Sequence, residues 1–300
     1  MGRFIFIFVF ALPLVLGCKK MSYRKTPGGM LYQVFPGKDT QMVRPGNVIK
    51  ISLTQKINDS VYFTTQDKMP IYFPVMPTSQ TYDLGELWLK LKKGDSVVAT
   101  QMMDTFIVRN PASVPPQFKK GDRIISQVKI LDIFPSDSLA QADNKKIQDD
   151  RLQQEVSLIS NYLAEKKINT QKTSLGSFVE IKNPGTGPLI DTGNYVTVNY
   201  TGTSWSGVVF DSNVDTAFHH VQPYSFVIGD GSMIRGFDEG MLYLRKGAAA
   251  RIYIPSMLAY GANPGSPKIK PLEHLIFDIT VLDVQSKAPE QQAPLIPPGH

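Results

Sequence analysis

Three groups of residues in this 300-residue sequence could take part in chemistry: a glycine-rich stretch, two adjacent histidines and a single cysteine. The glycine-rich stretch, Gly229 to Met241, reads GDGSMIRGFDEGM and contains the apolar pair Met233 and Ile234. Glycine-rich loops bind phosphate in Rossmann or P-loop spacing, whereas this one reads G-x-G-x4-G and leads into only a short helical segment. We therefore expect no nucleotide site here, and the apolar pair requires another explanation.

The two histidines, His219 and His220, lie in the segment from Val214 to Gln222. Adjacent side chains point apart, and a zinc site needs three or four ligands, of which no third is evident here. We therefore interpret the pair as loop residues and predict no metal site.

The cysteine, Cys18, is the only one in the chain, so no intramolecular disulfide can form. It follows one arginine and an apolar run from Phe4 to Leu16, which is typical of a secretory signal and short for a membrane span. A lone cysteine after Val-Leu-Gly resembles the lipobox of bacterial lipoproteins. That resemblance implies cleavage before Cys18 and diacylglycerol on its thiol; the alternative is an uncleaved signal anchor with an incidental cysteine.

The charge pattern and the lipobox together suggest where the protein acts. The net charge is +6, but lysine and arginine are scattered, so we predict no nucleic-acid partner. A lipid on Cys18 would tether the chain to a membrane without spanning it. We expect a lipid-anchored protein of the cell envelope, on the outer membrane. Since no acidic run follows Cys18, we expect it to face the periplasm rather than the cell surface.

Two parts of the chain repeat the same pattern. GMLYQVFPGKD, from Gly29, resembles GSFVEIKNPGTG, from Gly176, and RPGNVIKISLT, from Arg44, resembles DTGNYVTVNYT, from Asp191. Further matching stretches keep the same order, with Phe63 opposite Phe210. Each copy consists of alternating strands with one short helical segment, which predicts an α+β fold: two domains, each a curved antiparallel β-sheet around a short helix.

The segment between the copies, Ser136 to Lys167, is polar and lacks glycine and proline. Leu152, Val156, Ile159 and Leu163 recur at helical spacing, which predicts a long α-helix with one apolar stripe joining the two domains. The stripe could pack on a domain or pair with a second copy; we expect the former, because the repeat is short for a coiled coil. The predicted organisation is signal peptide 1–17, flexible tether 18–28, first domain 29–135, helical linker 136–170, second domain 171–286 and proline-rich disordered tail 287–300.

The second copy resembles the FKBP-type peptidyl-prolyl cis-trans isomerases. The motifs that carry the resemblance are VNYTG, VFDSN, PYSFVIG, MIRGFDEGM, LAYG and LIFDITVLDV, in this order between Val198 and Val284. The resemblance implies catalytic roles for Tyr200, Asp211, Ile234 and Tyr260. It implies a substrate-binding surface made of Phe210, Tyr224, Met233, Phe237, Ile269 and Phe277.

The implied roles are those of a dry slot for proline. Phe237 forms its floor, the Ile234 backbone N–H donates to a substrate carbonyl, and the Tyr260 hydroxyl reaches the carbonyl of the rotating bond. Asp211 lies near Tyr200 and faces that carbonyl. No cofactor is implied. Phe237 replaces the tryptophan of many relatives, and Tyr224 replaces a phenylalanine.

The first copy departs further from the family pattern. Leu53 aligns with Tyr200 and Thr64 with Asp211, Leu84 aligns approximately with Phe237, and no Ala-Tyr-Gly follows Met103. We interpret the first copy as a degenerate domain retained for structure or protein binding.

The resulting hypothesis is a peptidyl-prolyl cis-trans isomerase that assists the folding of exported proteins in the bacterial envelope. Its partners would be proline-containing unfolded or exported polypeptides. The alternative is a non-catalytic chaperone, or a subunit of an envelope or outer-membrane assembly, that uses FKBP-like domains for binding. The joint presence of Asp211, Tyr200 and Tyr260 favours catalysis.

Overall fold

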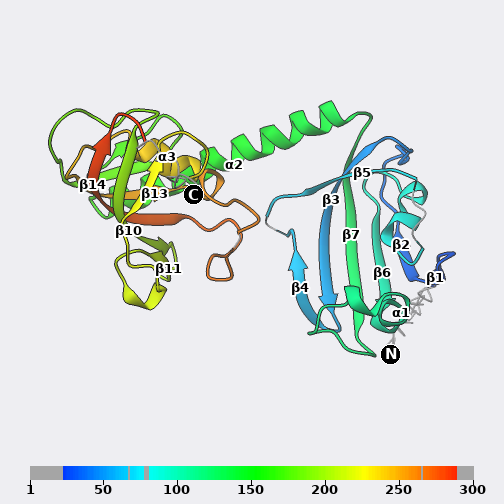
Figure 1. Cartoon of the computed structure of the whole chain (residues 1–300). Helices are drawn as coiled ribbons and strands as arrows, with labels where there is room; N and C mark the ends of the chain where they lie inside the picture. The colour runs from blue at the N-terminus through cyan, green and yellow to red at the C-terminus, as the bar shows by residue number, and fades with distance from the viewer. Residues whose placement is uncertain (1–22, 67, 78–80, 265, 289–300) are drawn as a thin grey trace, which may run out of the picture. The chain divides into compact units, whose positions relative to one another are not determined.

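The computed structural model describes residues 23–66, 68–77, 81–264 and 266–288 (Figure 1). The chain divides into two compact units: residues 1–66 with 70–137, and residues 138–300 with 67–69. The signal segment, Cys18 and residues 289–300 of the tail lie outside the described residues. No helix in the described part of the chain combines the length and apolarity needed to cross a membrane.

The first unit is an antiparallel sheet of seven strands in the order β1-β2-β6-β7-β3-β4, with β5 also pairing with β3. Every second side chain of β6 is buried, so one face of the sheet covers a core. The strands are β1 (Arg24–Lys25), β2 (Leu31–Phe35), β3 (Val48–Ile57), β4 (Ser60–Thr64), β5 (Ile71–Pro74), β6 (Ser96–Met102) and β7 (Arg123–Phe134).

The second unit repeats this topology. Its seven strands run β8-β9-β13-β14-β10-β11, with β12 also pairing with β10, and each occupies the place of its counterpart in the first unit. The strands are β8 (Gln171–Lys172), β9 (Phe178–Asn183), β10 (Tyr195–Ser204), β11 (Val209–Ser212), β12 (Tyr224–Val227), β13 (Ala249–Ile254) and β14 (Leu275–Gln285). The predicted fold class, two antiparallel sheets of the same plan with a long helix between them in the chain, is confirmed.

The strand registers give a residue-by-residue match between the units. A register shift occurs after Lys50 in β3 and after Thr197 in β10, so Leu53 does occupy the position of Tyr200. The alignment of Thr64 with Asp211, in contrast, is wrong by one residue. Phe63 is the residue that pairs with Gln55 of β3, as Asp211 pairs with Gly202 of β10.

A pair of side-chain hydrogen bonds supports this correction. The hydroxyls of Thr54 and Thr64 lie 2.8 Å apart, and those of Thr201 and Ser212 lie 2.9 Å apart at the corresponding ladder position. Thr64 therefore matches Ser212, which leaves Phe63 in the place of Asp211. The two phenylalanines, Phe63 and Phe210, match in type but not in their position in the sheet.

A glutamate holds the N-terminal segment of each unit in the same way. Glu86 accepts hydrogen bonds from the Thr26 hydroxyl at 2.9 Å and the Gly28 N–H at 2.8 Å. Glu239 accepts from the Thr173 hydroxyl at 2.6 Å and from the Leu175 N–H at 2.6 Å. Because Glu86 matches Glu239, Leu84 matches Phe237, two residues earlier. Together with the pairing of β1 and β2, these contacts order residues 24–28, which belong to the predicted flexible tether.

The short helices differ between the units. In the second unit α3 (Arg235–Met241) precedes β13, whereas the first unit has only the 3-10 turns Leu84–Glu86 and Trp88–Lys90 at that place. The helix of the first unit is α1 (Met103–Arg109), which follows β6. Its aspartate in the first turn and arginine in the last complement the helix dipole. The remaining 3-10 turns are η3 (Pro111–Ser113), η4 (Thr216–Phe218) and η5 (Ser256–Leu258).

Glycine lets α3 lie close to the sheet. A β-carbon at Gly236 would stand 2.4 Å from Ile254 Cγ2 of β13 and 2.7 Å from Ser177 Oγ. No real side chain tolerates such contacts, so a residue without a side chain is needed where the helix touches the sheet. This explains part of the glycine-rich stretch: the glycine is used for packing rather than for phosphate binding.

The long helix α2 (Asp137–Glu165) confirms the helix predicted between the copies. Its apolar stripe packs on the second unit, where Val156, Ile159 and Leu163 form a buried cluster with Phe178 and Tyr253. The predicted packing of the stripe on a domain is thus confirmed. In sequence α2 joins the units, but in packing it belongs to the second.

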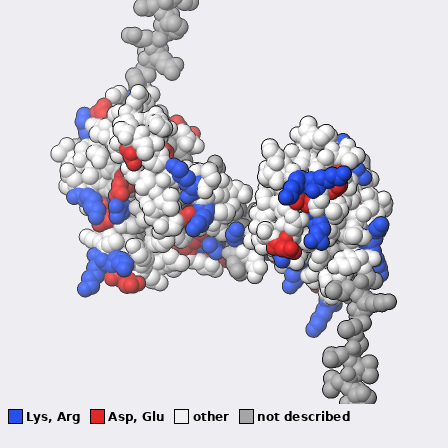
Figure 2. Space-filling model, turned by 90° about the horizontal axis from the view of Figure 1, so that it is seen from below, with Lys and Arg blue, Asp and Glu red and all other residues white. Residues whose placement is uncertain are grey.

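Charged side chains of both signs are interspersed on the face drawn in Figure 2. Part of the positive charge is paired locally. Lys93 Nζ lies 2.7 Å from Asp132 in the first unit, and Lys246 Nζ lies 2.7 Å from Asp283 in the second. Since the two pairs occupy equivalent positions, they belong to the shared scaffold.

Candidate functional site

Eight of the ten predicted catalytic and substrate-binding residues surround one cavity in the second unit. Its volume is about 140 Å³, and its lining comes from the sheet strands β10, β11 and β14, from the start of α3 and from the turn after β13. The lining residues are Tyr200, Phe210, Asp211, Ser232, Met233, Ile234, Phe237, Tyr260 and Phe277. Segments far apart in the chain thus meet at one place.

Aromatic rings form the base of the cavity. The Phe237 side chain is 0% exposed, and its ring centroid lies 5.0 Å from that of Phe277 at an interplanar angle of 81°. The Phe210 ring also meets Phe277 edge to face, with the ring centroids 5.6 Å apart. Such edge-to-face pairs are favourable beyond their buried area, so these rings hold one another in place.

Gly202 of β10 makes room for these rings. A β-carbon at this position would stand 2.5 Å from Phe210 Cζ and 3.0 Å from Phe277 Cε1. The rings of Phe210 and Phe277 therefore lie directly against the backbone of β10. The apolar walls depend on the absence of a side chain at position 202.

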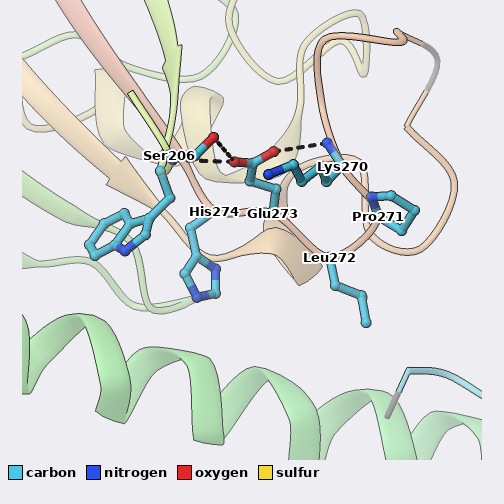
Figure 3. A pocket seen from close by; sticks show the side chains of 7 residues that line it. Ser206, Lys270, Pro271, Leu272, Glu273 and His274 are labelled. Atoms are coloured by element: carbon cyan, nitrogen blue, oxygen red, sulfur yellow. Dashed lines mark hydrogen bonds between the residues drawn. The ribbon is translucent and has the colours of Figure 1, made fainter. Parts of the chain in front are cut away.

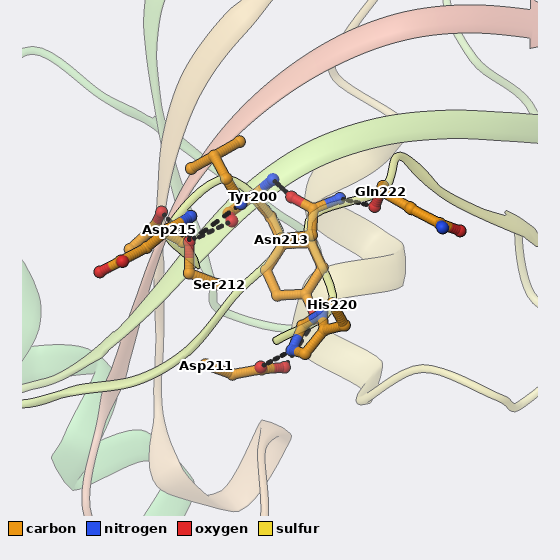
Figure 4. Close-up of polar contacts among 9 residues, drawn as sticks. Tyr200, Asp211, Ser212, Asn213, Asp215, His220 and Gln222 are labelled. Atoms are coloured by element: carbon orange, nitrogen blue, oxygen red, sulfur yellow. Dashed lines mark hydrogen bonds and ion pairs between the residues drawn. The ribbon is translucent and has the colours of Figure 1, made fainter. Parts of the chain in front are cut away.

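The polar groups lie together at one side of the cavity (Figure 4). The Tyr200 hydroxyl donates to Asp211 Oδ2 at 2.6 Å, and Nε2 of His220 lies 2.9 Å from Asp211 Oδ1. Both carboxylate oxygens of Asp211 are therefore engaged. This fixes the orientation of the carboxylate at the edge of an otherwise apolar cavity.

Asn213 holds the loop that carries His220. Its side-chain oxygen accepts from the Tyr200 N–H at 2.7 Å, and its amide donates to the carbonyls of Val198 at 3.0 Å and Gln222 at 2.9 Å (Figure 4). The Asn213 side chain is 2% exposed, so these bonds are shielded from water. They fix both ends of the loop against β10, which brings His220 back over Asp211.

Both tyrosine hydroxyls at the cavity remain protonated at neutral pH. Burial, followed by the hydrogen bond to Asp211, raises the pKa of Tyr200 above its usual range. Burial, followed by the negative charge of Asp211, raises the pKa of Tyr260. A protonated phenol donates a hydrogen bond, so Tyr260 can offer one to a carbonyl in the cavity.

Ile234 is the N-cap residue of α3 and has an extended backbone, with φ −63° and ψ 140°. Its carbonyl accepts from the Phe237 N–H at 2.9 Å and so begins the helix. The N–H of an N-cap residue is not used by the bonds of its own helix. This geometry leaves the Ile234 N–H beside the cavity for the donor role predicted from the sequence.

Two predicted binding residues do not line the cavity. Tyr224 is 42% exposed, and its ring lies 6.3 Å from Tyr200 and 5.7 Å from Phe226, outside the lining. Ile269 is buried in the core of the second unit. Conversely, two features of the cavity are not predicted from the sequence: Ser232 in its lining and the contact of His220 with Asp211.

His220 was interpreted as a loop residue, and only the folded loop shows its contact with Asp211. The one signal in the sequence is the position of His220, nine residues after the predicted catalytic residue Asp211. Among the described residues, no group of three or more histidine, cysteine, aspartate or glutamate side chains is arranged to hold a metal ion. We therefore assign His220 to the polar cluster around Asp211.

A second hollow in the same unit is built differently (Figure 3). It has a volume of about 290 Å³ and is lined by Trp205, Ser206 and residues 270–274. Glu273 accepts from the Ser206 hydroxyl at 2.7 Å and from the Lys270 N–H at 2.8 Å, so its carboxylate is used to hold the loop. Its aromatic lining is Trp205 and His274, whose ring centroids lie 5.5 Å apart, and it contains none of the predicted site residues.

Comparison with known proteins identifies the family. The family model for the FKBP-type peptidyl-prolyl cis-trans isomerases matches residues 187–282. The FK506-binding protein of Neisseria meningitidis serogroup B is 35% identical over 109 residues, which cover 36% of this chain and 96% of that protein. The chain belongs to the FKBP-type isomerase family.

Longer relatives are matched only in part. The FKBP-type peptidyl-prolyl cis-trans isomerase FkpA of Buchnera aphidicola is 36% identical over 147 residues, which cover 49% of this chain and 53% of that protein. The chain thus spans about half the length of this relative. Among solved structures, FkpA from Escherichia coli is 28% identical, with a TM-score of 0.38, over 51% of this chain and 68% of that one.

The family match coincides with the cavity. All nine residues that line the cavity fall between Tyr200 and Phe277, within the matched range of 187–282. The first unit lies outside that range. The FKBP-type features of this chain are therefore concentrated in the second unit.

Proposed function

We propose that the second unit catalyses cis–trans isomerisation of Xaa–Pro bonds in polypeptides. The observation that carries the proposal is the combination of an aromatic cavity with a carboxylate and a protonated tyrosine at its edge. In this assignment Tyr200, Asp211, Ile234 and Tyr260 are catalytic. The proline ring is bound by Phe210, Met233, Phe237 and Phe277.

The chemistry requires few groups. Rotation about an Xaa–Pro bond meets a barrier of about 18–20 kcal/mol, because the C–N bond is partly double. The twisted state loses this resonance and part of the charge separation of the planar amide. An apolar cavity such as the one above Phe237 therefore favours the twisted state over the planar one. An acceleration of about a thousandfold needs about 4 kcal/mol of this differential stabilisation.

The polar edge orients the substrate. The Ile234 N–H and the Tyr260 hydroxyl donate to carbonyls on either side of the proline, and Asp211 sets the polarity beside the rotating bond. Tyr224, outside the cavity, extends the contact surface along the bound chain. Ile269 supports the adjacent loop from within the core.

The test is a protease-coupled isomerisation assay with an Xaa–Pro peptide on residues 21–286. We expect acceleration over the uncatalysed rate, and a loss of roughly ten- to a hundredfold in kcat/KM for Tyr260→Phe, the size of one transition-state contact. Tyr243→Phe is the matched control, because Tyr243 does not line the cavity. No acceleration by the unaltered protein would contradict the proposal and favour a binding role without catalysis.

The place of action is a separate proposal. A lipid on Cys18 would hold the protein at the periplasmic side of the outer membrane, where exported chains fold and proline isomerisation is slow. Replacing Cys18 with serine should abolish incorporation of a fatty-acid analogue and release the protein from membranes. Membrane association and labelling that survive the replacement would contradict the lipid anchor.

A further inference from the structure

The helix α2 carries a buried carboxylate that its packing does not require. Glu155 is 3% exposed, although the apolar stripe of α2 already packs on the second unit. Burying a carboxylate is costly unless it is paired and fully hydrogen-bonded, and apolar residues of similar volume often serve stability as well. A role other than attachment of the helix is therefore indicated for Glu155.

Glu155 is bonded to the turn that leads to Tyr260. Its Oε1 accepts from the Ser256 hydroxyl at 2.6 Å, and its Oε2 accepts from the Met257 N–H at 3.1 Å. Arg151, one turn earlier in α2, supplies the opposite charge, with Nε 2.9 Å from Oε1. Both carboxylate oxygens therefore fix the first two residues of η5.

Ser256 in turn fixes the backbone on both sides of Tyr260. The Ser256 carbonyl accepts from the Ala259 N–H at 3.0 Å and from the Gly261 N–H at 2.9 Å. The Tyr260 backbone thus lies between two residues that are bonded to one oxygen of Ser256. A displacement of Ser256 would move the Tyr260 hydroxyl at the edge of the cavity.

His274 holds Ser256 from the other side. Its Nδ1 accepts from the Ser256 N–H at 3.2 Å and lies 3.9 Å from Glu155 Oε2. In Figure 3 the His274 ring, one of the side chains that line the hollow, points toward α2. Ser256 is 0% exposed and is bonded through its hydroxyl, its N–H and its carbonyl.

The first unit has no such arrangement. The position of Ser256 is taken there by Met103, the first residue of α1, whose N–H donates to the Asp122 carbonyl at 2.8 Å. No carboxylate from a preceding helix reaches this position among the described residues. The carboxylate contact is present in the unit that has the aromatic cavity, whereas the matching position of the first unit is bonded to the Asp122 carbonyl.

We propose that Glu155 is a positioning residue for Tyr260, and that α2 is part of the isomerase site rather than only a connection between domains. Glu155 fixes the position of Ser256, and the Ser256 carbonyl fixes the two residues that flank Tyr260. Tyr260 then presents its hydroxyl to the cavity. This inference rests on the proposed isomerase function of the second unit.

The test compares single and double variants of the full chain in the Xaa–Pro assay. Glu155→Gln should lower kcat/KM roughly three- to tenfold, the effect of one weakened hydrogen bond. Ser256→Ala removes only the hydroxyl contact and should lower kcat/KM less than Glu155→Gln does. It also provides a test if Glu155→Gln does not fold. The matched control is Glu165→Gln, an exposed carboxylate at the end of the same helix, which should change kcat/KM less than twofold.

The deciding measurement repeats Glu155→Gln and Ser256→Ala in a Tyr260→Phe background. If Glu155 acts through the Tyr260 hydroxyl, each change should lose most of its effect there, because the two effects are coupled. Equal losses with and without the hydroxyl would show a purely structural role and overturn the inference, as would full activity of both single variants. An inactive unaltered chain would instead overturn the proposed function itself, and the inference with it.

Discussion

The two units share a scaffold but differ at the cavity. Both have the same strand order, the same register shift in the central strand and a glutamate that holds the N-terminal segment. At the cavity, Gly202 and Phe277 of the second unit correspond to Gln55 and Ser126 of the first, since each pair is adjacent in the same ladder. In the first unit Gln55 Nε2 donates to Ser126 Oγ at 3.3 Å.

The comparison shows which residues make the cavity and which make the fold. At this position of the sheet the first unit has the polar pair Gln55 and Ser126, where the second unit has Gly202 and Phe277. The strands pair in both units, so the sheet requires neither the glycine nor the aromatic ring. Asp211 likewise corresponds to Phe63, and Tyr200 to Leu53. The differences fall on the residues that the proposed reaction uses. The repeat thus separates scaffold from function within one chain.

The largest expected difference between the units comes from their central apolar residues. Phe237→Ala should destabilise the second unit by about 3–5 kcal/mol, because the fully buried ring leaves a cavity. Leu84→Ala at the matching position should cost about 2 kcal/mol, since Leu84 is only partly buried. The chain has one tryptophan in each unit, Trp88 and Trp205. Variants that keep one of them can report unfolding of each unit by fluorescence, and equal costs at the two positions would contradict the predicted difference between the units.

The next prediction concerns the space beside β10. Gly202→Ala should push Phe210 and Phe277 apart, with a cost of about 1–3 kcal/mol in the free energy of unfolding. Isomerase activity should fall at least tenfold, because these rings line the cavity. Gln55→Ala in the first unit is the matched control; it removes the bond to Ser126 and should leave activity unchanged. Full activity of Gly202→Ala would show that the rings need not lie against the strand.

A smaller effect is expected from the loop that carries His220 and contacts Asp211. His220→Ala removes the contact with Asp211 Oδ1 and should change kcat/KM by a factor of about two to five, as for one partly exposed bond. His219→Asn is the control, because asparagine tolerates the left-handed backbone at this position. A kcat/KM for His220→Ala equal to that of His219→Asn and of the unaltered protein would exclude the role of His220.

The smallest effect is a dependence of stability on pH through His274. Burial lowers the pKa of His274, although the charge of Glu155 opposes this effect. The unfolded chain therefore binds a proton at higher pH than the folded one. The stability that this provides is present above the unfolded pKa, near 6.5, and is lost as the pH falls through it toward the folded pKa. Urea unfolding followed by circular dichroism should show that the free energy of unfolding falls between pH 7 and pH 5, and that it falls less in His274→Gln. An equal fall in both proteins would refute the role of His274.

Much of this organisation could be predicted from the sequence. The repeat, the fold class and the long helix follow from strand alternation, helical spacing and repeated motifs. Eight of the lining residues follow from the resemblance to the FKBP-type isomerases. The alignment of Phe63 with Phe210 was wrong. It rested on the shared residue type, whereas the hydrogen bonds between the paired strands decide which positions correspond. Sequence spacing shows which residues share a strand face, but not how two hairpins of different length align.

The contacts that escaped prediction join distant or irregular segments. His220 reaches Asp211 only because Asn213 folds the loop back, and this depends on backbone carbonyls that no pattern of side chains reveals. Glu155 and Ser256 are 101 positions apart, and a single polar residue on an amphipathic helix does not show its partner. Irregular loops and buried polar pairs therefore remained open until the structure was known.

The central claim is that isomerase activity belongs to the second unit alone, and matched substitutions in the full chain test it most directly. Asp211→Ala removes the carboxylate at the cavity, and Phe63→Ala changes the residue in the same ladder position of the first unit. We expect kcat/KM on an Xaa–Pro peptide to fall roughly ten- to a hundredfold for Asp211→Ala, and less than twofold for Phe63→Ala. Full activity of Asp211→Ala, or a comparable loss in Phe63→Ala with its fold intact, would contradict the account.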